Sequence, residues 1–355
     1  MAGGDLLVVE GAMGLFDGAP DPATPLGHGS TADVAAALSL PVVLVIDAAR
    51  TAQTVAAIVA GLAGFRADVQ IAGVILNRVG SDRHAIMLRA AVETVVPVLG
   101  AIPRDEALAT PSRHLGLVQA RERGDLDAFI DCAADMVSAS CDLDAVLALA
   151  APVAPGDEPA RLAPLGQRIA VAGDVAFGFA YPHMLADWRA AGAEIVPFSP
   201  LADQPPDGEA DAVFLPGGYP ELHAGPLSAA TRFAAGVRAA RDRGATVYGE
   251  CGGYMTLGTG IVDAAGLRHA MLGLLDVETS FAERRLHLGY RSLRACSPLP
   301  WGSAFRGHEF HYATVLHERG APLFTLHDSA GADLGHAGLR DGRVCGSFAH
   351  IVERA

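Results

Sequence analysis

Short apolar runs rich in valine, leucine and isoleucine alternate with helix-like segments along the first part of the chain. The runs predict strands at residues 5–10, 41–47, 69–77 and 98–102, and helices between them at residues 31–39, 51–64 and 81–95. Strands this continuously apolar are buried on both faces, and strands that are separated by helices pair in parallel. The pattern therefore predicts a parallel sheet with helices on both faces.

A stretch rich in proline and alanine at residues 150–159 interrupts this pattern and is typical of a linker. The alternation then restarts, with expected strands at residues 168–172, 194–198, 211–215 and 246–248 and a more β-rich region at 272–315. The pattern predicts an α/β protein of two domains. We place these domains at residues 1–149 and 167–355, joined by a linker at residues 150–166.

Composition and charge narrow the class of protein. The chain carries 26 basic and 40 acidic side chains and a net charge of −14, which argues against nucleic acid or an anionic membrane as a partner. No apolar run reaches the roughly 18 residues of a membrane span, and no signal-like segment opens the chain, so we expect a cytoplasmic protein. The five cysteines form no C-x-x-C pair, which argues against a disulfide framework or a zinc site.

Cys251 stands at a distinctive break in the pattern, between an apolar run at 245–248 and a helix-like run. Glycines flank it in a G-x-C-x-G arrangement, in which small residues permit a sharp strand-to-helix turn that holds the sulfur above the sheet edge. The N-terminus of the following helix would favour the thiolate over the thiol. Cys251 is thus a candidate nucleophile, and the alternative is one more buried, inert cysteine.

Two further segments supply what such a nucleophile needs. The Pro-Gly-Gly turn after the strand at 211–215 presents backbone amides, so the N–H groups of Gly218 and Gly252 are candidates to stabilise the oxyanion that forms when a thiolate attacks an amide. An ordinary strand-terminating turn is the alternative. A strand at 343–350 ends in His350, the natural base for Cys251, although a lone histidine at a strand end is more often an exposed polar residue.

This order of elbow, glycine turn and histidine, over residues 169–352, resembles the triad-type (class I) glutamine amidotransferase domain. The resemblance implies a cysteine that takes the amide group of glutamine through a thioester and releases ammonia. In the general class a glutamate stands two positions after the histidine, whereas here that place holds Val352 and Glu353 follows one later. The third member is either absent or supplied differently. The subgroup that works with cysteine and histidine alone is attached to cobalamin-pathway amide synthases.

The string at residues 6–18 carries a second resemblance. An acid at the end of a buried parallel strand lies at the sheet edge where α/β proteins bind ligands, so Glu10 is either an Mg²⁺ ligand or a solvated loop residue. The string resembles the Glu-Gly-x-Met-Gly-Leu-x-Asp-Gly signature of the cobyrinic acid and hydrogenobyrinic acid a,c-diamide synthases. By that match, Glu10 contributes to the Mg-ATP site and Asp17 to the handling of the corrinoid carboxylate.

The run at residues 73–79 resembles the strand of this family whose asparagine contacts adenine, which assigns Asn77 to ATP. A side-chain amide can donate to and accept from a base edge, although a turn residue is the alternative. The resemblance further implies a P-loop-type, dethiobiotin-synthetase-like first domain and a class I glutamine amidotransferase-like second domain. It also implies Mg²⁺ as cofactor, glutamine, ATP and a corrinoid as substrates, and a homodimer as an open possibility.

The implied reaction is the ATP- and glutamine-dependent amidation of the a and c side-chain carboxylates of a corrinoid in cobalamin biosynthesis. Within enzymes, the alternative is another tetrapyrrole amide synthase, such as cobyric acid synthase or a synthase that acts on a nickel tetrapyrrole. The string at residues 10–18 favours the a,c-diamide group. From a different class, the alternative is an inactive remnant or a glutaminase half that needs a partner for ATP.

Relatives in this family open with a strand and a phosphate-binding loop of the G-x-x-x-x-G-K-[ST] type. The printed sequence has no such motif before Glu10. We therefore expect the first strand, loop and helix of the first domain to be missing, as in an N-terminally truncated protein. We also expect the chain as printed to be inactive as a synthetase.

Overall fold

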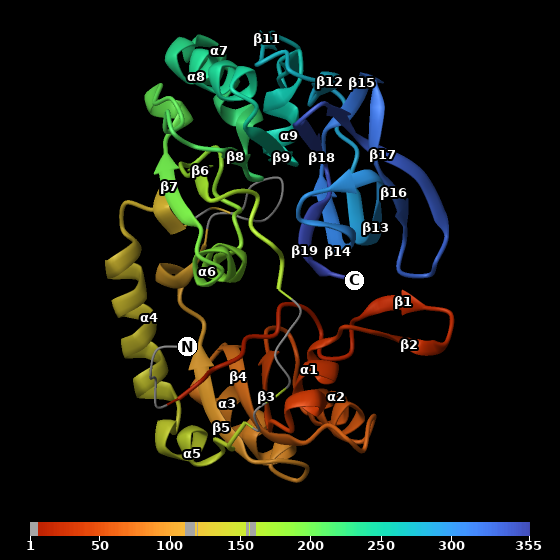
Figure 1. Ribbon diagram of the computed structural model, residues 1–355. Helices are drawn as coiled ribbons and strands as arrows, with labels where there is room; N and C mark the ends of the chain where they lie inside the picture. The colour runs from red at the N-terminus through yellow and green to blue at the C-terminus, as the bar shows by residue number, and fades with distance from the viewer. Residues whose placement is uncertain (1–5, 111–117, 119, 154–155, 157–160) are drawn as a thin grey trace. The chain divides into compact units, whose positions relative to one another are not determined.

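The computed structural model describes residues 6–110, 118, 120–153, 156 and 161–355. The chain forms two compact units, Met1–Asp157 and Glu158–Ala355 (Figure 1). The predicted linker at residues 150–166 spans the boundary between these units, and part of it lies outside the described residues.

Helices and a small sheet build the first unit. Its elements in chain order are β1 (Ala19–Asp21), β2 (Thr24–His28), α1 (Thr31–Leu38), β3 (Val42–Asp47), α2 (Thr54–Ala63), β4 (Ile71–Val79), α3 (Asp82–Val92), β5 (Val98–Pro103), α4 (Leu126–Ser140) and α5 (Leu143–Ala148). Within the described residues, β3, β4 and β5 pair in parallel in that order, while β1 and β2 form a separate antiparallel hairpin. The predicted strands at residues 41–47, 69–77 and 98–102 are thus confirmed to within a few residues.

Serine residues begin two of these helices. The Ser30 hydroxyl accepts the Asp33 N–H and the Asp33 carboxylate accepts the Ser30 N–H, which is a capping box at the start of α1. The Ser81 hydroxyl accepts the His84 N–H at the start of α3. Alternate β4 side chains, those of Val74 and Leu76, are fully buried and pack in one cluster with apolar side chains of α2 and α3. Apolar side chains at strand spacing in β4 and at helix spacing in α2 and α3 therefore share one core, as the sequence pattern predicts.

The strand predicted at residues 5–10 is wrong for the part that the structure describes. Residues 6–10 have no strand partner, and their apolar side chains are open to solvent, with Leu6 and Val8 50% and 80% exposed. An apolar run forms a strand only where a sheet edge satisfies its backbone groups, and the described sheet ends at β3. The apolar pattern was correct for strand propensity, but it carries no information on whether a partner is present.

The second unit contains more of the described helices and strands than the first. In chain order they are β6 (Arg168–Ala172), α6 (Pro182–Ala190), β7 (Glu194–Phe198), β8 (Ala212–Leu215), α7 (Ala224–Ala229), α8 (Thr231–Asp242), β9 (Thr246–Glu250), α9 (Gly252–Leu257), β10 (Gly260–Val262), β11 (Arg268–Ala270), β12 (Asp276–Ser280), β13 (His287–Leu299), β14 (Gly302–His311), β15 (Thr314–Arg319), β16 (Ala321–His327), β17 (Asp333–Asp341), β18 (Val344–Ser347) and β19 (His350–Arg354). The strands predicted at residues 168–172, 194–198, 211–215 and 246–248 and the β-rich region are confirmed.

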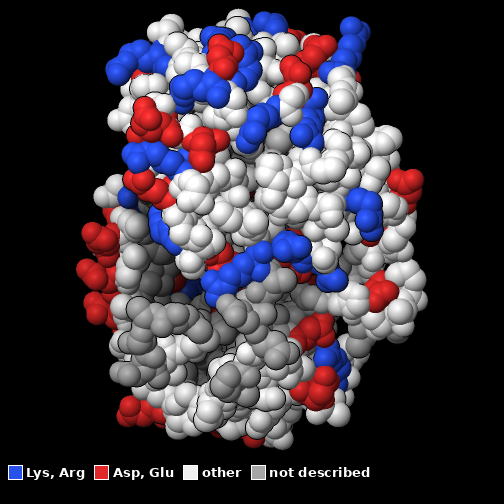
Figure 2. Space-filling model, in the orientation of Figure 1, with Lys and Arg blue, Asp and Glu red and all other residues white. Residues whose placement is uncertain are grey.

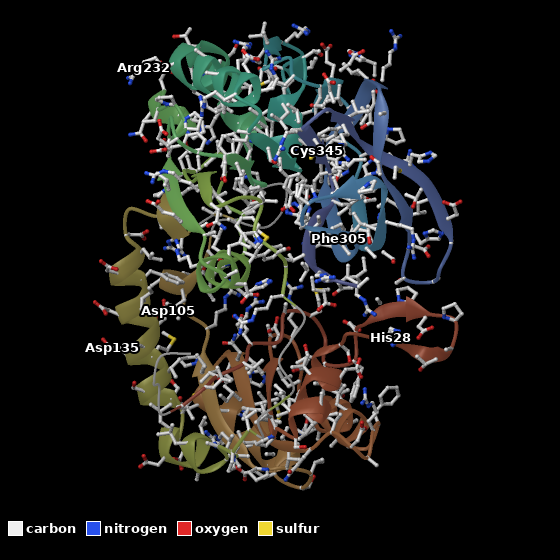
Figure 3. All side chains as sticks on the ribbon, viewed as in Figure 1. His28, Asp105, Asp135, Arg232, Phe305 and Cys345 are labelled. Carbon is white, nitrogen blue, oxygen red and sulfur yellow. The ribbon has the colours of Figure 1, made fainter. Side chains whose placement is uncertain are left out.

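One mixed sheet organises the second unit. Among the described residues, ten strands form it in the order β19-β14-β13-β16-β17-β18-β9-β8-β6-β7, and the strands from β18 to β7 pair in parallel. In β8, Val213 and Leu215 pack in one cluster with α7 and α8, whereas Phe214 packs on the opposite face with α6 (Figure 1). Phe305 of β14 continues that second core into the antiparallel strands, where its ring lies edge-on to Phe324 at 6.1 Å (Figure 3).

The surface of the first unit is acidic along one helix. Asp127, Asp131 and Asp135 of α4 are exposed and spaced four residues apart, so they share one helix face. Figure 2 shows acidic side chains in a row at this edge of the molecule. In the described part of the chain, no helix is long and apolar enough to span a membrane.

A close backbone approach fixes α9 against β8. A Cβ atom on Gly253 would lie 1.8 Å from the Leu215 carbonyl oxygen, so Gly253→Ala forces backbone to move. We expect this substitution to destabilise the second unit by about 3 kcal/mol, as overpacking does. Calorimetry then records a thermal midpoint lower by roughly 6 °C or more. Gly208→Ala is the matched control, because a Cβ on Gly208 meets nothing within 4 Å. Equal midpoints for the two variants would contradict this packing.

Candidate active site

The chain turns sharply between β9 and α9, and Cys251 is the residue at the turn. Its backbone has φ of 46° and ψ of −102°, which is strained for a residue with a side chain. Two hydrogen bonds hold this conformation: the Cys251 N–H donates to the Ser347 carbonyl at 2.8 Å, and the Met255 N–H donates to the Cys251 carbonyl at 3.0 Å. The geometry is that of a nucleophile elbow, with the thiol 5% exposed.

A glycine loop lies directly beside the elbow. The Gly218 nitrogen is 3.0 Å from the point where a Cβ on Gly252 would sit, so the two predicted oxyanion amides approach each other. The Phe179 N–H donates to the Gly217 carbonyl at 3.0 Å, and the Tyr219 N–H donates to the Ala176 carbonyl at 3.1 Å, which fixes the loop. Among the described residues, the Gly218 N–H has no acceptor. It is therefore available to a bound substrate.

His350 is buried against the same loop. A Cβ on Gly217 would lie 2.3 Å from Cε1 of His350, so only a glycine leaves room for the imidazole. The ring of His308 stacks on it at 5.0 Å. Burial, together with His308, lowers the pKa of His350 to about 3. The imidazole is therefore neutral near pH 7 and able to accept a proton.

The predicted strand at residues 343–350 is wrong in its end point. β18 ends at Ser347, and His350 begins β19 instead of closing the strand before it. The reason is a change of partner: β18 pairs in parallel with β9, whereas β19 pairs antiparallel with β14. The backbone must turn between the two ladders, and the Ser347 hydroxyl accepts the Ala349 N–H in that turn.

Cys251 does not rest as a thiolate. Burial above all, and then Glu221, raise the pKa of its thiol to about 12, although the Gly252 amide acts in the opposite direction. The expected preference for thiolate is therefore wrong for the unliganded protein. α9 spans only Gly252–Leu257, and its end does not offset the removal of the sulfur from water.

Glu250 is a site residue that the sequence analysis missed. Its carboxyl group is 1% exposed, and Oε1 accepts the Tyr248 hydroxyl at 3.0 Å and the Ile351 N–H at 3.1 Å. Oε2 lies 3.8 Å from Nδ1 of His350 and has no hydrogen-bond partner among the described residues. The signal in the sequence was a single acid inside an otherwise uncharged buried strand, directly before the nucleophile.

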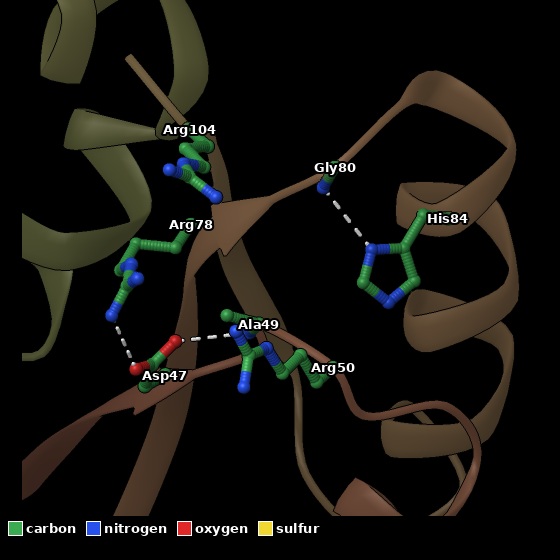
Figure 4. A pocket seen from close by; sticks show the side chains of 7 residues that line it. All are labelled: Asp47, Ala49, Arg50, Arg78, Gly80, His84 and Arg104. Carbon is green, nitrogen blue, oxygen red and sulfur yellow. Dashed lines mark hydrogen bonds and ion pairs between the residues drawn. The ribbon is translucent and has the colours of Figure 1, made fainter. Parts of the chain in front are cut away.

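In the first unit, the carboxyl ends of β3, β4 and β5 border an open hollow of about 480 Å³ (Figure 4). The hollow is lined by Asp47, Ala49, Arg50, Arg78, Gly80, His84 and Arg104. An Arg78 guanidinium N–H donates to the Asp47 carboxylate at 2.9 Å, and the Gly80 N–H donates to Nδ1 of His84 at 3.1 Å. Guanidinium groups at this edge of a parallel sheet suit an anionic ligand.

The three predicted ligand-binding residues of the first unit lie on separate segments of the chain: Asn77 within β4, and Asp17 and Glu10 in the stretch before β1. Asn77 pairs with Asp47 across β4 and β3, and its side-chain oxygen accepts the Arg78 N–H at 2.9 Å. The Asp17 carboxylate accepts the Gly14 N–H at 3.1 Å, and Glu10 is exposed. Within the described residues, no group of three or more metal-ligating side chains comes together. Their assigned roles stay predictions.

Comparison with known proteins defines the class. Residues 168–354 match the CobB/CobQ-like glutamine amidotransferase domain, and residues 2–112 match an AAA domain, a nucleotide-using type of domain. The second unit is therefore a glutamine amidotransferase domain, and the predicted combination of an ATP-type parallel-sheet domain with an amidotransferase domain is confirmed. The protein is an enzyme of the amide-forming ligase class that uses glutamine.

Relatives identify the family. Proteins named hydrogenobyrinate a,c-diamide synthase from Brucella anthropi and Rhizobium meliloti are each 56% identical to this chain, over 99% of the chain and 81% of the relative. One of the same name from Rhodobacter capsulatus is 52% identical over the same shares. The chain belongs to the hydrogenobyrinate a,c-diamide synthase family, as its sequence motifs predict.

The raised pKa of Cys251 has a measurable consequence. Because the thiolate fraction rises tenfold per pH unit below the pKa, alkylation of Cys251 by iodoacetamide should be slow near pH 7 and accelerate about tenfold per unit through pH 9. Peptide mass spectrometry separates this label from that on the exposed Cys296, the internal reference, which should react first. Fast, pH-independent labelling of Cys251 between pH 6 and 8 would instead reveal a resting thiolate.

Proposed function

We propose that this protein amidates the a and c side-chain carboxylates of a corrinoid, hydrogenobyrinic or cobyrinic acid, with glutamine as nitrogen donor and ATP as activating co-substrate. This is a step of cobalamin biosynthesis. The observation that carries the proposal is the strained elbow of Cys251, which lies between the Gly218 loop and the strand that leads to the buried His350. Support comes from relatives of that name at 56% identity.

Glutamine hydrolysis follows from this geometry. His350 takes the proton of the Cys251 thiol, and the sulfur attacks the side-chain carbonyl carbon of glutamine. The N–H groups of Gly218 and Gly252 stabilise the oxyanion that forms when the sulfur attacks this carbonyl carbon. His350 then gives its proton to the departing nitrogen, so that the carbon–nitrogen bond breaks and ammonia leaves. Water, deprotonated by His350, cleaves the thioester to glutamate and restores the thiol.

Ammonia is consumed at the first unit in this proposal. ATP activates a corrinoid carboxylate as an acyl phosphate, and ammonia displaces the phosphate to leave a primary amide. Asn77 contacts adenine, Asp17 orients the corrinoid carboxylate, and the guanidinium groups of Arg50 and Arg78 face the anionic groups. Magnesium in such sites is held by one or two carboxylates together with phosphate oxygens, so the single exposed Glu10 is compatible with holding it. The metal neutralises phosphate charge when it is bound.

Two predictions about the whole protein stay open beside this function. A homodimer is one of them. The other is the choice of corrinoid, hydrogenobyrinic or cobyrinic acid. Another tetrapyrrole amide synthase remains the second candidate function. Comparison of product formation from hydrogenobyrinic acid, its cobalt form and a nickel tetrapyrrole separates these candidates.

Substitution of Cys251 tests whether it serves glutamine hydrolysis alone and not the amidation of the corrinoid. Cys251→Ala should abolish glutamate release from glutamine, because no other group makes the thioester. The variant should still amidate the corrinoid when ammonium salts replace glutamine, to the extent that the parent does. Cys345→Ala is the matched control, since Cys345 is also a buried cysteine, on the neighbouring strand β18 (Figure 3). Glutamate release from Cys251→Ala at the parent rate would refute the elbow assignment.

Removal of the base should have a graded effect. His350→Ala should lower the glutaminase kcat by something on the order of 10²-fold or more, because nucleophile and base act as a unit. Glu353→Gln should change it by less than about twofold, since surface substitutions usually change free energies by under 0.5 kcal/mol. Glu353 is 55% exposed and only loosely paired with Arg306, at 3.9 Å. Equal losses from the two variants would show that Glu353 is the triad acid.

A further inference from the structure

His350 lacks the partner that its class would give it. In the triad-type domain that the sequence resembles, a glutamate two positions after the histidine accepts the Nδ1 proton and orients the ring. Here Val352 holds that position, and the next residue, Glu353, faces solvent and Arg306. A histidine that acts as a base through Nε2 needs an acceptor at Nδ1, because the proton on Nδ1 leaves Nε2 free to accept.

A carboxyl oxygen of Glu250 lies near Nδ1 of His350 and is suited to be this acceptor. Two donors, the Tyr248 hydroxyl and the Ile351 N–H, bind Oε1, whereas Oε2 of the same carboxyl group has no hydrogen bond among the described residues. Oε2 lies 3.8 Å from Nδ1 of His350, and both side chains are almost fully buried. A buried polar atom without a partner costs free energy, so this oxygen stands where a donor is missing.

We infer that Glu250 is the third member of the triad, a positioning residue whose Oε2 accepts the Nδ1–H of His350 and stabilises the imidazolium that forms when Cys251 gives up its proton. The inference rests on the proposed function, since it takes Cys251 and His350 as the reacting pair. The acid comes from the residue directly before the nucleophile instead of from the strand that carries the histidine. Strand β9 thus ends on the group that orients the base, and the nucleophile follows directly after it.

The distance between Oε2 of Glu250 and Nδ1 of His350 is that of a pair that has not yet formed its hydrogen bond. A separation of 3.8 Å exceeds a hydrogen bond, but catalytic hydrogen bonds are often long in unliganded enzymes and tighten when substrate binds. The terminal torsion of a glutamate side chain is broad, so a small rotation of the whole carboxyl group costs little free energy. The closed contact adds a charge-assisted hydrogen bond at the moment when the imidazole becomes positive.

The protonation of Glu250 gives this role a pH signature. Burial raises the pKa of Glu250 to about 8, although the Ile351 N–H and the Tyr248 hydroxyl act against that shift. Only the ionised carboxylate supplies the negative charge that stabilises the imidazolium, so glutaminase activity should rise with pH through about 8 and fall below it.

Most other titratable groups around this pair stay neutral in that range, but Glu221 does not: burial raises its pKa to about 7, and its charge acts on Cys251. Burial raises the pKa of Tyr181, Cys251 and Cys345 to about 12 and that of Tyr248 well above its usual value. Burial also lowers the pKa of His308, which stacks on the His350 ring. An acid limb near pH 8 in the glutaminase profile is therefore assigned to Glu250 when it disappears in Glu250→Gln and persists in Glu221→Gln.

Glu250→Gln is the sharpest test. The amide oxygen still accepts from Tyr248 and Ile351, but the amide nitrogen now faces Nδ1 of His350 and donates to it, which puts the ring proton on Nε2. We expect the glutaminase kcat to fall on the order of 10³-fold, as for a wrong tautomer, with little change in the KM for glutamine. The acid limb near pH 8 should disappear. Glu250→Asp keeps a carboxylate and should recover part of the loss, and Glu353→Gln is the matched control.

The outcomes separate this inference from the function on which it rests. A Glu250→Gln protein with parent kcat and an unchanged acid limb overturns the inference, while an inactive Cys251→Ala protein leaves the proposed function intact. If Glu250→Gln does not fold, nitrogen NMR of histidine-labelled parent protein, assigned with His350→Gln, decides the tautomer above pH 8. A proton on Nδ1 of His350 supports the triad, and a proton on Nε2 overturns it.

Discussion

The strained backbone of Cys251 is the constraint on which the rest of the site depends. A residue with a side chain adopts a positive φ only where its surroundings over-determine it, and here a hydrogen bond to Ser347 and the glycine contacts of α9 do so. Because Ser347 ends β18, the same hydrogen bond places the turn that leads to His350. Because Gly252 touches the Gly218 loop, the elbow also places the oxyanion amides. One backbone conformation thus positions the proposed nucleophile, the proposed oxyanion loop and the turn before the strand that begins at His350.

Burial gives this site its electrostatic character. Removal from water raises the pKa of Cys251 and Glu250 and lowers that of His350, so all three groups prefer their neutral forms at rest. A thiolate and an imidazolium are then costly until other groups compensate for the lost hydration. The amides of the glycine loop and a carboxylate at Nδ1 are groups of that kind, and they act most strongly where water is excluded. We therefore expect the charged pair to form only when bound glutamine and these groups together replace the lost water.

The sequence predicted those parts of the fold that depend on neighbours along the chain. The strands at residues 168–172 and 194–198 match β6 and β7 to the residue, and the elbow lies where the glycines placed it. The errors came from contacts that the local pattern does not encode. The run at residues 5–10 has the composition of a strand but no described partner, and the strand before His350 ends early because the backbone changes ladders. Glu250 was overlooked because its contact with His350 joins positions that only the folded sheet brings together.

The covalent intermediate tests the central claim most directly. The account predicts that glutamine labelled with heavy carbon, or a diazo-ketone analogue of glutamine, becomes attached to the protein at a single cysteine, and that acid quenching followed by peptide mass spectrometry finds the label on Cys251. The buried Cys345 and the exposed Cys296 provide internal comparison in the same digest. Label on either of these residues, or glutamine hydrolysis at the normal rate without any label on Cys251, would contradict the account.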